Sequence, residues 1–235
     1  MINQILNSSQ QTARLAGFLY LLLIPLGYFG VLYVSSLVAP EDMTLTIENI
    51  VASESMYRLS MASALLMNVV SVLLVLALYK LLKSVDKNMA GFMVVLLLPG
   101  AGIAMLNELN HFVLLALSNV EAGTVFTAGQ LQYLVGLSLD MYEFGSYIAA
   151  IFWGLWLFPL GYLIYKSNFV PKILGVLLVI AGVGYVVDSF LLFLAPQLGI
   201  TITDFTFIGE ITIMLWLLIK GVNVQAKEKA ILEPA

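Results

Sequence analysis

The stretch LAGFLYLLLIPLGYFGVLYVSSLV, which spans Leu15–Val38, decides the fold class of this chain. Its 24 residues include no charged side chain. A helix of about 20 predominantly apolar residues crosses the ~30 Å hydrocarbon core of a bilayer. A secretory signal peptide has a shorter apolar region, and Leu37 is too large for a signal-peptidase site ending at Ala39. We therefore interpret the stretch as a retained first membrane span.

Apolar runs of similar length follow along the 235-residue chain, of which 61% of residues are hydrophobic and 10% are charged. Soluble domains carry roughly 25% charged residues. We therefore predict an all-α membrane protein, a bundle of six transmembrane helices with short interfacial helices on the outer side. The expected spans are Leu15–Val38, Met56–Leu82, Met89–Ser118, Phe144–Tyr165, Ile173–Leu194 and Phe205–Ile219.

Two polar or extended segments are expected outside the hydrocarbon core. A single helix over Gln130–Tyr165 would be about 54 Å long, too long for one span, so Gln130–Glu143 is expected as an outer extension or an interfacial helix. Thr44 or Thr46 is expected to cap a short surface helix in the polar stretch Pro40–Ser55.

The basic residues predict the orientation of the bundle. With the amino terminus inside, Arg58 is the single basic residue outside, and the other nine of the ten are cytoplasmic. The positive-inside rule then places both termini in the cytoplasm. The expected division is a cytoplasmic segment over residues 1–13, the transmembrane domain over 14–222 and a cytoplasmic tail over 223–235.

Composition also excludes several classes of protein. The net charge is −4, and no basic patch with interleaved aromatic residues points to nucleic acid. The chain has no cysteine, so thiolate chemistry and sulfur-ligated metals are ruled out. It carries no P-loop, nucleophile elbow or dinucleotide fingerprint, so no enzyme class is indicated and no cofactor is predicted. The expected partner is the lipid bilayer; a homo-oligomer and a small ligand or cation stay open.

Ionisable side chains within or beside the spans are the candidate functional residues. At a helix centre each costs about 2.5–3.5 kcal/mol to insert, so such residues usually face a bundle interior or a watery cavity. With the orientation above, the five carboxylates among them lie in the outer third of the membrane, near one guanidinium and one imidazole. The candidate binding residues are Arg58, Glu108, His111, Asp140, Glu143, Asp188 and Glu210.

Three interpretations of these residues remain open. Glu108 and His111 are three residues apart and share a helix face, as in the Glu-x-x-His motif of di-metal helix bundles. Those bundles carry two such motifs, whereas this chain has one histidine, so no metal site is predicted and the pair are weak candidates only. The second interpretation is a proton or cation relay. The third is structural, with interhelical hydrogen bonds and an ion pair between Arg58 and one of the carboxylates.

The fourth apolar region, Gln130–Tyr165, also carries a seam of polar and small residues at heptad spacing, suited to packing against another helix. We expect this seam to face a neighbouring helix. Its members are Tyr133, Gly136, Asp140, Glu143, Tyr147, Ala150 and Gly154.

Several stretches resemble an uncharacterised bacterial membrane family, the domain of unknown function numbered four-three-eight-six. The stretches that carry the resemblance are Arg14–Gly17, Tyr57–Leu59, Gly161–Ser167, Pro171–Gly175, Gly184–Phe190, Gly209-Glu210 and Leu215–Leu218. The resemblance covers about Arg14–Val222. It implies a protein of the bacterial cytoplasmic membrane with no established activity, in which Arg58, Asp188 and Glu210 match family positions. The segment Asn107–His111 and Asp140 match no family motif.

Two classes of function follow. The first is a small transporter or cation- or proton-coupled carrier with an outward-facing polar site around Arg58, Asp188 and Glu210. The second is a non-catalytic accessory or sensor protein whose buried polar residues only fix the helix register. A membrane-embedded metal hydrolase that uses His111 is a third and weaker interpretation.

Overall fold

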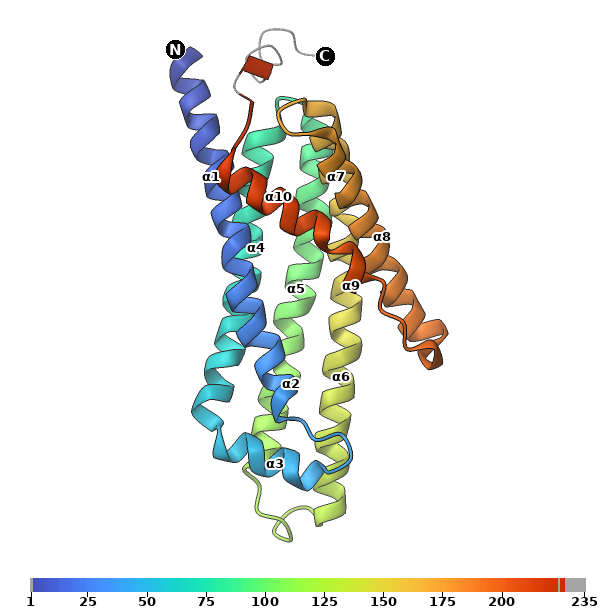
Figure 1. Ribbon diagram of the computed structural model, residues 1–235. Coiled ribbons are helices and arrows are strands. Elements are labelled where there is room, and N and C mark those ends of the chain that lie inside the picture. The colour runs from blue at the N-terminus through green and yellow to red at the C-terminus, as the bar shows by residue number, and fades with distance from the viewer. Residues whose placement is uncertain (1, 224, 227–235) are drawn as a thin grey trace. The chain divides into compact units, whose positions relative to one another are not determined.

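The computed structural model describes residues 2–223 and 225–226, and all regular secondary structure in this part of the chain is helical (Figure 1). The helices, in chain order, are α1 (Ile2–Gly27), a π-helical turn (Tyr28–Leu32), α2 (Tyr33–Leu37), α3 (Met43–Ala52), α4 (Glu54–Leu82), α5 (Lys87–Ser118), α6 (Ala128–Leu155), α7 (Leu157–Ser167), α8 (Lys172–Leu194), a 3₁₀ turn (Pro196–Leu198), α9 (Thr203–Thr206) and α10 (Ile208–Ile219).

Five helical stretches among the described residues are long and apolar enough to cross a membrane. They are Ser8–Leu37, Glu54–Leu82, Lys87–Ser118, Ala128–Ser167 and Lys172–Leu194. They cover the first five expected spans, except that the first ends one residue earlier than expected, at Leu37. The expected extension Gln130–Glu143 continues directly into the fourth as part of α6. The chain therefore has the helices of a polytopic membrane protein.

The expected sixth span, Phe205–Ile219, is divided between α9 and α10. The longer of the two, α10, has 12 residues and a length of about 18 Å, shorter than the ~30 Å hydrocarbon core. It is not among the five candidate spans. The count of six spans and the placement of both termini in the cytoplasm thus stay predictions.

The chain forms two compact units. Unit 1 comprises Met1–Leu22, Val70–Ala101 and Tyr147–Ala235. Unit 2 comprises Leu23–Val69 and Gly102–Ser146.

Two prolines coincide with irregular helix geometry. Proline lacks an N–H donor, and its ring collides with the carbonyl group four residues earlier. Pro159 lies four residues after Leu155, the last residue of α6, so the break between α6 and α7 at Trp156 follows from this collision. Pro25 precedes the π-helical turn, whose Gly30 is buried.

In unit 1, α6 and α7 together pack antiparallel to α8 through two pairs of glycines. A Cβ atom added to Gly154 would lie 2.7 Å from the carbonyl oxygen of Gly182, and one added to Gly161 would lie 2.6 Å from that of Gly175. The two glycines on each side of the contact are seven residues apart, so the helix backbones approach closely at both pairs. The turn between α7 and α8 contains Asn168 with a positive φ of 54°, a left-handed conformation that asparagine tolerates.

The last helix of unit 1, α10, runs between α1 and α8 (Figure 1). At one end, a Cβ atom on Gly209 would lie 2.5 Å from the carbonyl oxygen of Leu177 in α8. At the other end, a Cβ atom on Gly17 of α1 would lie 2.5 Å from the backbone nitrogen of Leu218. Because backbone occupies both spaces, glycine is required where α10 meets each neighbour.

A side chain of α1 also holds the segment that follows α10. The amide nitrogen of Gln10 donates to the carbonyl oxygen of Lys220 at 2.9 Å, and its amide oxygen accepts from the backbone N–H of Val222 at 3.0 Å. The first and the last helix of unit 1 are thus joined by glycine packing and by two hydrogen bonds.

In unit 2, α3 packs on a small apolar core. The carboxylate of Asp42 accepts from the backbone N–H groups of Thr44 and Leu45, so Asp42 is the N-cap of α3. The prediction of Thr44 or Thr46 as the cap is therefore wrong: the Thr46 hydroxyl group is buried and bonds to the backbone at Ala39. The core consists of Val34, Ile50, Tyr57, Leu114, Leu115 and Val135.

Candidate functional site

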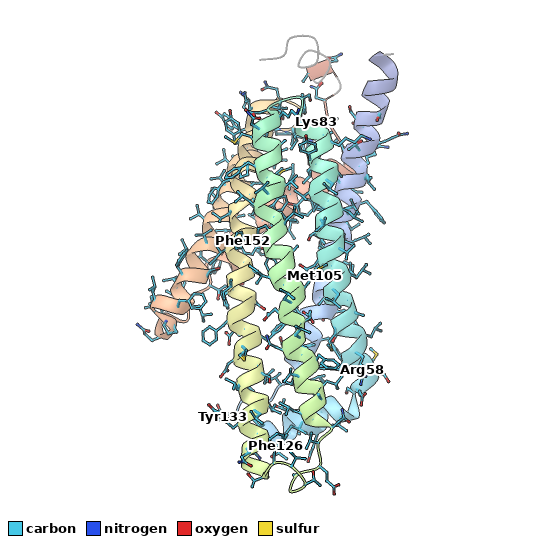
Figure 2. The ribbon with its side chains drawn as sticks, turned by 180° about the vertical axis from the view of Figure 1, so that it is seen from behind. Arg58, Lys83, Met105, Phe126, Tyr133 and Phe152 are labelled. Atoms are coloured by element: carbon cyan, nitrogen blue, oxygen red, sulfur yellow. The ribbon has the colours of Figure 1, made fainter. Side chains whose placement is uncertain are left out.

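Of the seven candidate binding residues, the structure brings Glu108 and His111 together on one buried face of α5 in unit 2. Their exposed fractions are 6% and 2%. Asp140 and Glu143, on α6 of the same unit, are exposed. The polar seam expected along α6 therefore does not face a neighbouring helix throughout, and Tyr133 at its start is 71% exposed (Figure 2).

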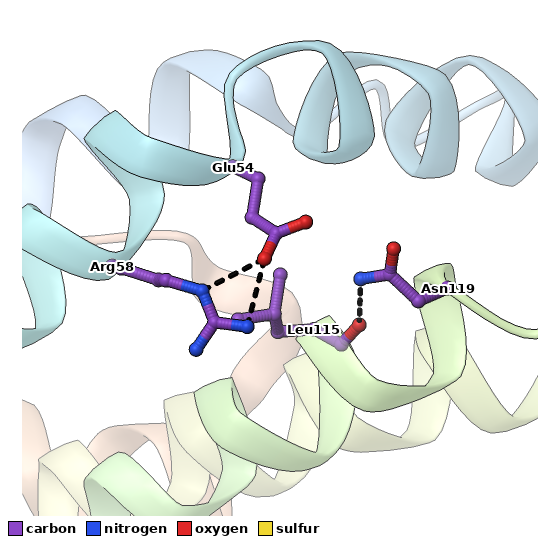
Figure 3. A network of polar contacts seen from close by, with 4 residues as sticks. All are labelled: Glu54, Arg58, Leu115 and Asn119. Carbon is purple, nitrogen blue, oxygen red and sulfur yellow. Dashed lines mark hydrogen bonds and ion pairs between the residues drawn. The ribbon is translucent and has the colours of Figure 1, made fainter.

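Arg58, the single guanidinium of the expected site, pairs with a carboxylate on its own helix. Its Nη2 atom lies 2.7 Å from Oε1 of Glu54, one turn earlier in α4, and its side chain is 57% exposed (Figures 2 and 3). The expected pairing of Arg58 with a carboxylate within the spans is thus replaced by a local surface pair. Such exposed pairs on one helix contribute about 0.3–0.5 kcal/mol.

Asp188 and Glu210 belong to unit 1. The buried carboxylate of Asp188 accepts from the backbone N–H groups of Ile202 and Thr203, at 2.8 and 2.7 Å, and so caps the start of α9. Glu210, in the first turn of α10, is partly buried and accepts from the hydroxyl group of Tyr20 at 3.5 Å. Asp188 therefore has a backbone-binding role that accounts for its burial.

The remaining pair, Glu108 and His111, is surrounded by two tyrosines and an asparagine from helices of unit 2. We call Tyr57, Asn107, Glu108, His111 and Tyr142 the His111 cluster. The hydroxyl oxygen of Tyr57, which is fully buried on α4, lies 2.8 Å from Nδ1 of His111. The two rings meet edge to face with their centroids 5.7 Å apart. Tyr57 thus orients the imidazole ring from one side.

Tyr142, on α6, contacts both ionisable residues of the cluster. Its ring centroid lies 3.8 Å from that of His111. Its hydroxyl group donates to Oε1 of Glu108 at 3.4 Å. One side chain therefore links the carboxyl group and the imidazole ring.

Asn107 positions Tyr142 through the backbone. Its amide nitrogen donates to the carbonyl oxygen of Tyr142 at 2.8 Å and to the hydroxyl group of Ser146 at 3.1 Å. Its amide oxygen accepts from Asn110 at 2.9 Å. The Asn107 side chain also fills the space that a Cβ atom at Gly145 would occupy. Glycine at position 145 thus allows Asn107 to reach the α6 backbone.

Two buried polar atoms of the cluster have no hydrogen-bond partner in the structure, Oε2 of Glu108 and Nε2 of His111. Leaving such a group unsatisfied costs about 1–3 kcal/mol, more for a charged group. The two ion pairs among the described residues are Arg58–Glu54 and Lys166–Asp86, so neither neutralises Glu108. The arrangement leaves one acidic and one basic group of the same helix face available to a further binding partner.

The cluster does not resemble a metal centre. The described residues include no group of three or more His, Cys, Asp or Glu side chains placed to share a metal ion. A catalytic zinc site takes three protein ligands. Glu108 and His111, the weak metal candidates of the sequence, therefore lack a third ligand of this kind in the described part of the chain.

The sequence names Glu108 and His111 as candidates, but it does not name Tyr57 and Tyr142, which contact them. A usable signal for Tyr142 exists, because Tyr142, Gly145 and Ser146 form a polar and small stripe with helical spacing. This stripe is one position away from the seam through Asp140 and Glu143. No comparable spacing marks Tyr57, which reaches the cluster from another helix.

Comparisons with known proteins give one family and one partial relative. The family described as "Domain of unknown function (DUF4386)" matches residues 15–221. An uncharacterized protein of Archaeoglobus fulgidus is 46% identical over 71 residues, which are 30% of this chain and 43% of that protein. The chain thus spans less than half the length of that relative. No solved structure matches the chain. Since the family match extends over most of the sequence, the chain belongs to the DUF4386 family.

Proposed function

We propose that this protein is a small cation- or proton-coupled carrier of the cell membrane and that the His111 cluster is its coupling site. The observation that carries the proposal is the pair of unpartnered polar atoms on Glu108 and His111, both buried within a candidate span. Ionisable residues inside membrane helices usually mark ion or proton pathways.

The proposal replaces the site expected around Arg58, Asp188 and Glu210. Asp188 is engaged by two backbone N–H groups, and Arg58 is engaged by Glu54. Both therefore have roles that need no ligand. We propose that both termini are cytoplasmic, as the basic residues predict, which places the His111 cluster toward the outer side.

A second candidate function is a non-catalytic accessory or sensor protein. It is favoured by the way in which Asp188 and Asn107 use buried polar atoms to hold the backbone of neighbouring segments. In such a protein Glu108 and His111 would likewise serve helix packing, and no water path would lead to them.

Accessibility separates the two functions, and the cysteine-free chain suits the test. Asn110→Cys places a thiol beside the cluster, on α5. Its reaction with a membrane-impermeant thiol reagent is compared in membrane vesicles with the exposed Glu121→Cys and with Leu74→Cys, whose position is fully buried. Vesicles of both orientations are used.

A carrier requires that water reach its coupling site from at least one side. We therefore expect Asn110→Cys to react at a rate closer to that of Glu121→Cys, from one side of the membrane. A rate as low as that of Leu74→Cys in both orientations contradicts the carrier and supports the accessory role.

A further inference from the structure

We infer that Glu108 and His111 together hold a single exchangeable proton, so that the ion coupled at the His111 cluster is a proton rather than a metal cation. The inference rests on the proposed function for its biological role. Its physical basis is the arrangement of donors and acceptors around the two residues, which stands independently of transport.

The hydrogen bonds of the cluster leave one position open on each residue. On His111, Nδ1 is bonded to the Tyr57 hydroxyl group, which leaves Nε2 free. On Glu108, Oε1 accepts from Tyr142, which leaves Oε2 free. Imidazole nitrogen and carboxyl oxygen can each carry or accept a proton. The two open positions are thus the ones at which a proton can be gained or lost.

The contacts of Tyr57 are compatible with two forms of the neutral imidazole ring. The Tyr57 hydroxyl oxygen is 2.8 Å from Nδ1 but 3.4 Å from the carbonyl oxygen of His111. If the Tyr57 proton is donated to Nδ1, the neutral ring carries its own proton on Nε2. If it is donated to the carbonyl oxygen, Nδ1–H donates to the Tyr57 oxygen and Nε2 is unprotonated. In both forms Nε2 of His111 and Oε2 of Glu108 stay without a partner.

Charge explains why Glu108 and His111 together hold one proton more than an ionised carboxylate and a neutral imidazole ring would. The titratable groups that face it are Tyr57 from α4 and Tyr142 from α6, and the hydroxyl groups of both are neutral at ordinary pH. Of the other charged groups of these helices in unit 2, Arg58, Asp140 and Glu143 are exposed, and Glu54 is half-buried and paired with Arg58. With one proton on the pair, its net charge is zero, whether the proton lies on the carboxyl group or on the ring.

Adding or removing a proton leaves a net charge of +1 or −1 in a buried site, which is costly without a counter-ion. The neutral one-proton state is therefore favoured over a wide pH range. When the proton leaves, the O–H bond of Glu108 breaks, the electron pair stays on the carboxylate oxygen and the proton passes to water. The resulting negative site then attracts a proton back, which is the cycle that a proton-coupled carrier needs.

The single histidine of the chain makes the inference testable without transport. The full-length protein is labelled with ¹⁵N-histidine, so its imidazole signals in nuclear magnetic resonance belong to His111 alone. The carbonyl stretch of a protonated carboxyl group is followed in parallel by infrared spectroscopy. Wild type, Glu108→Gln, Glu108→Asp and Glu143→Gln are compared across a pH titration.

In the wild type we expect the carboxyl band and the imidazole signals to change together in one pH step. Glu108→Gln should lose this step, whereas Glu143→Gln, which alters an exposed carboxylate on α6, should retain it. Glu108→Asp should retain a carboxyl band with a shifted midpoint, and it keeps the test valid if the glutamine variant does not fold. Identical imidazole signals in wild type and Glu108→Gln at every pH would overturn the inference, as would a carboxyl band that disappears without any change at His111.

The two proposals fail in different ways. An unreactive Asn110→Cys together with a shared titration step contradicts the carrier and leaves the shared proton in place. A reactive Asn110→Cys without a shared step leaves a carrier but overturns the proton as its coupled ion.

Discussion

At the scale of single residues, the contacts of the site depend on the size and spacing of neighbouring side chains more than on their charge. Asn107 reaches the α6 backbone because position 145 is glycine, and this contact holds Tyr142 over the His111 ring. Arg58 pairs with Glu54 because the two are four residues apart on one exposed helix face. The sequence therefore names the buried ionisable residues together with exposed ones such as Arg58 and Asp140, and it does not predict their partners. A partner on another helix changes when that helix is rotated by one residue.

Gly145→Ala should destabilise the protein, because the added methyl group would overlap the amide group of Asn107. Overpacking of this kind costs about 1–3 kcal/mol. The matched control is Gly136→Ala on the same helix, where a Cβ atom meets open space. Thermal unfolding in detergent should show a lower midpoint for position 145 and an equal or higher one for position 136. Equal losses at both positions would contradict the assigned contact.

At the scale of helices, close backbone approach and capping decide where elements begin and pack. The apolar runs predict five helices correctly because the hydropathy of a span is a sum over many residues. The boundaries depend on single groups instead. Asp42 rather than a threonine starts α3, and Pro159 divides the fourth candidate span into α6 and α7.

Gly161→Ala should loosen the contact between α7 and α8, because the new Cβ atom would lie 2.6 Å from the carbonyl oxygen of Gly175. Backbone cannot move aside as a flexible side chain can, so we expect a loss of about 1–3 kcal/mol. Gly91→Ala, at an open position of α5 in the same unit, is the control. The comparison is made by thermal unfolding, and a variant at position 161 as stable as the control would refute the close packing.

Asp86, in the connection before α5, should make stability depend on pH. The backbone N–H of Met89 donates to its carboxylate, and this bond, with the nearby Lys166, lowers the pKa of Asp86 below its usual 3.8. A lowered pKa means that the folded state favours the ionised form, so the stabilisation is present above pH 3.8 and is lost as the pH falls through the folded value.

Asp86→Asn should remove this acid-dependent part of the unfolding free energy. It is measured as the difference between melting curves at neutral pH and below pH 3.8. Glu121→Gln, which alters an exposed loop carboxylate, should keep the wild-type difference. If Asp86→Asn shows the same difference between the two pH values as the wild type, the bond between Asp86 and Met89 does not contribute to the acid dependence.

At the scale of the whole molecule, charge predicts an orientation that helix length alone does not. Nine of ten basic residues fall on one side when six spans alternate, yet α10 has 12 residues, and the described chain has five helices that meet the length of a span. Sequence hydropathy could not separate α9 from α10, because Phe207 between them is apolar, like Phe205 and Ile208.

The six-span arrangement predicts that both ends of the chain lie on the cytoplasmic side. Epitope tags at each terminus should be protected from protease in intact cells and cleaved after the membrane is opened. A tag inserted beside Glu121, in the loop expected outside, should be cleaved without opening. Protection of one terminus and not the other would show an odd number of crossings and would remove α10 from the membrane-spanning set.

The attachment of the last helix to the first has a consequence for biosynthesis. The arms α6–α7 and α8 contain both halves of their glycine contacts, so this hairpin can close as soon as it has been translated. Gly17 and the amide of Gln10, by contrast, are synthesised early and must wait for Leu218, Lys220 and Val222, which follow much later in the chain. This part of the protein therefore cannot reach its native state until α10 and the segment that follows it have been synthesised.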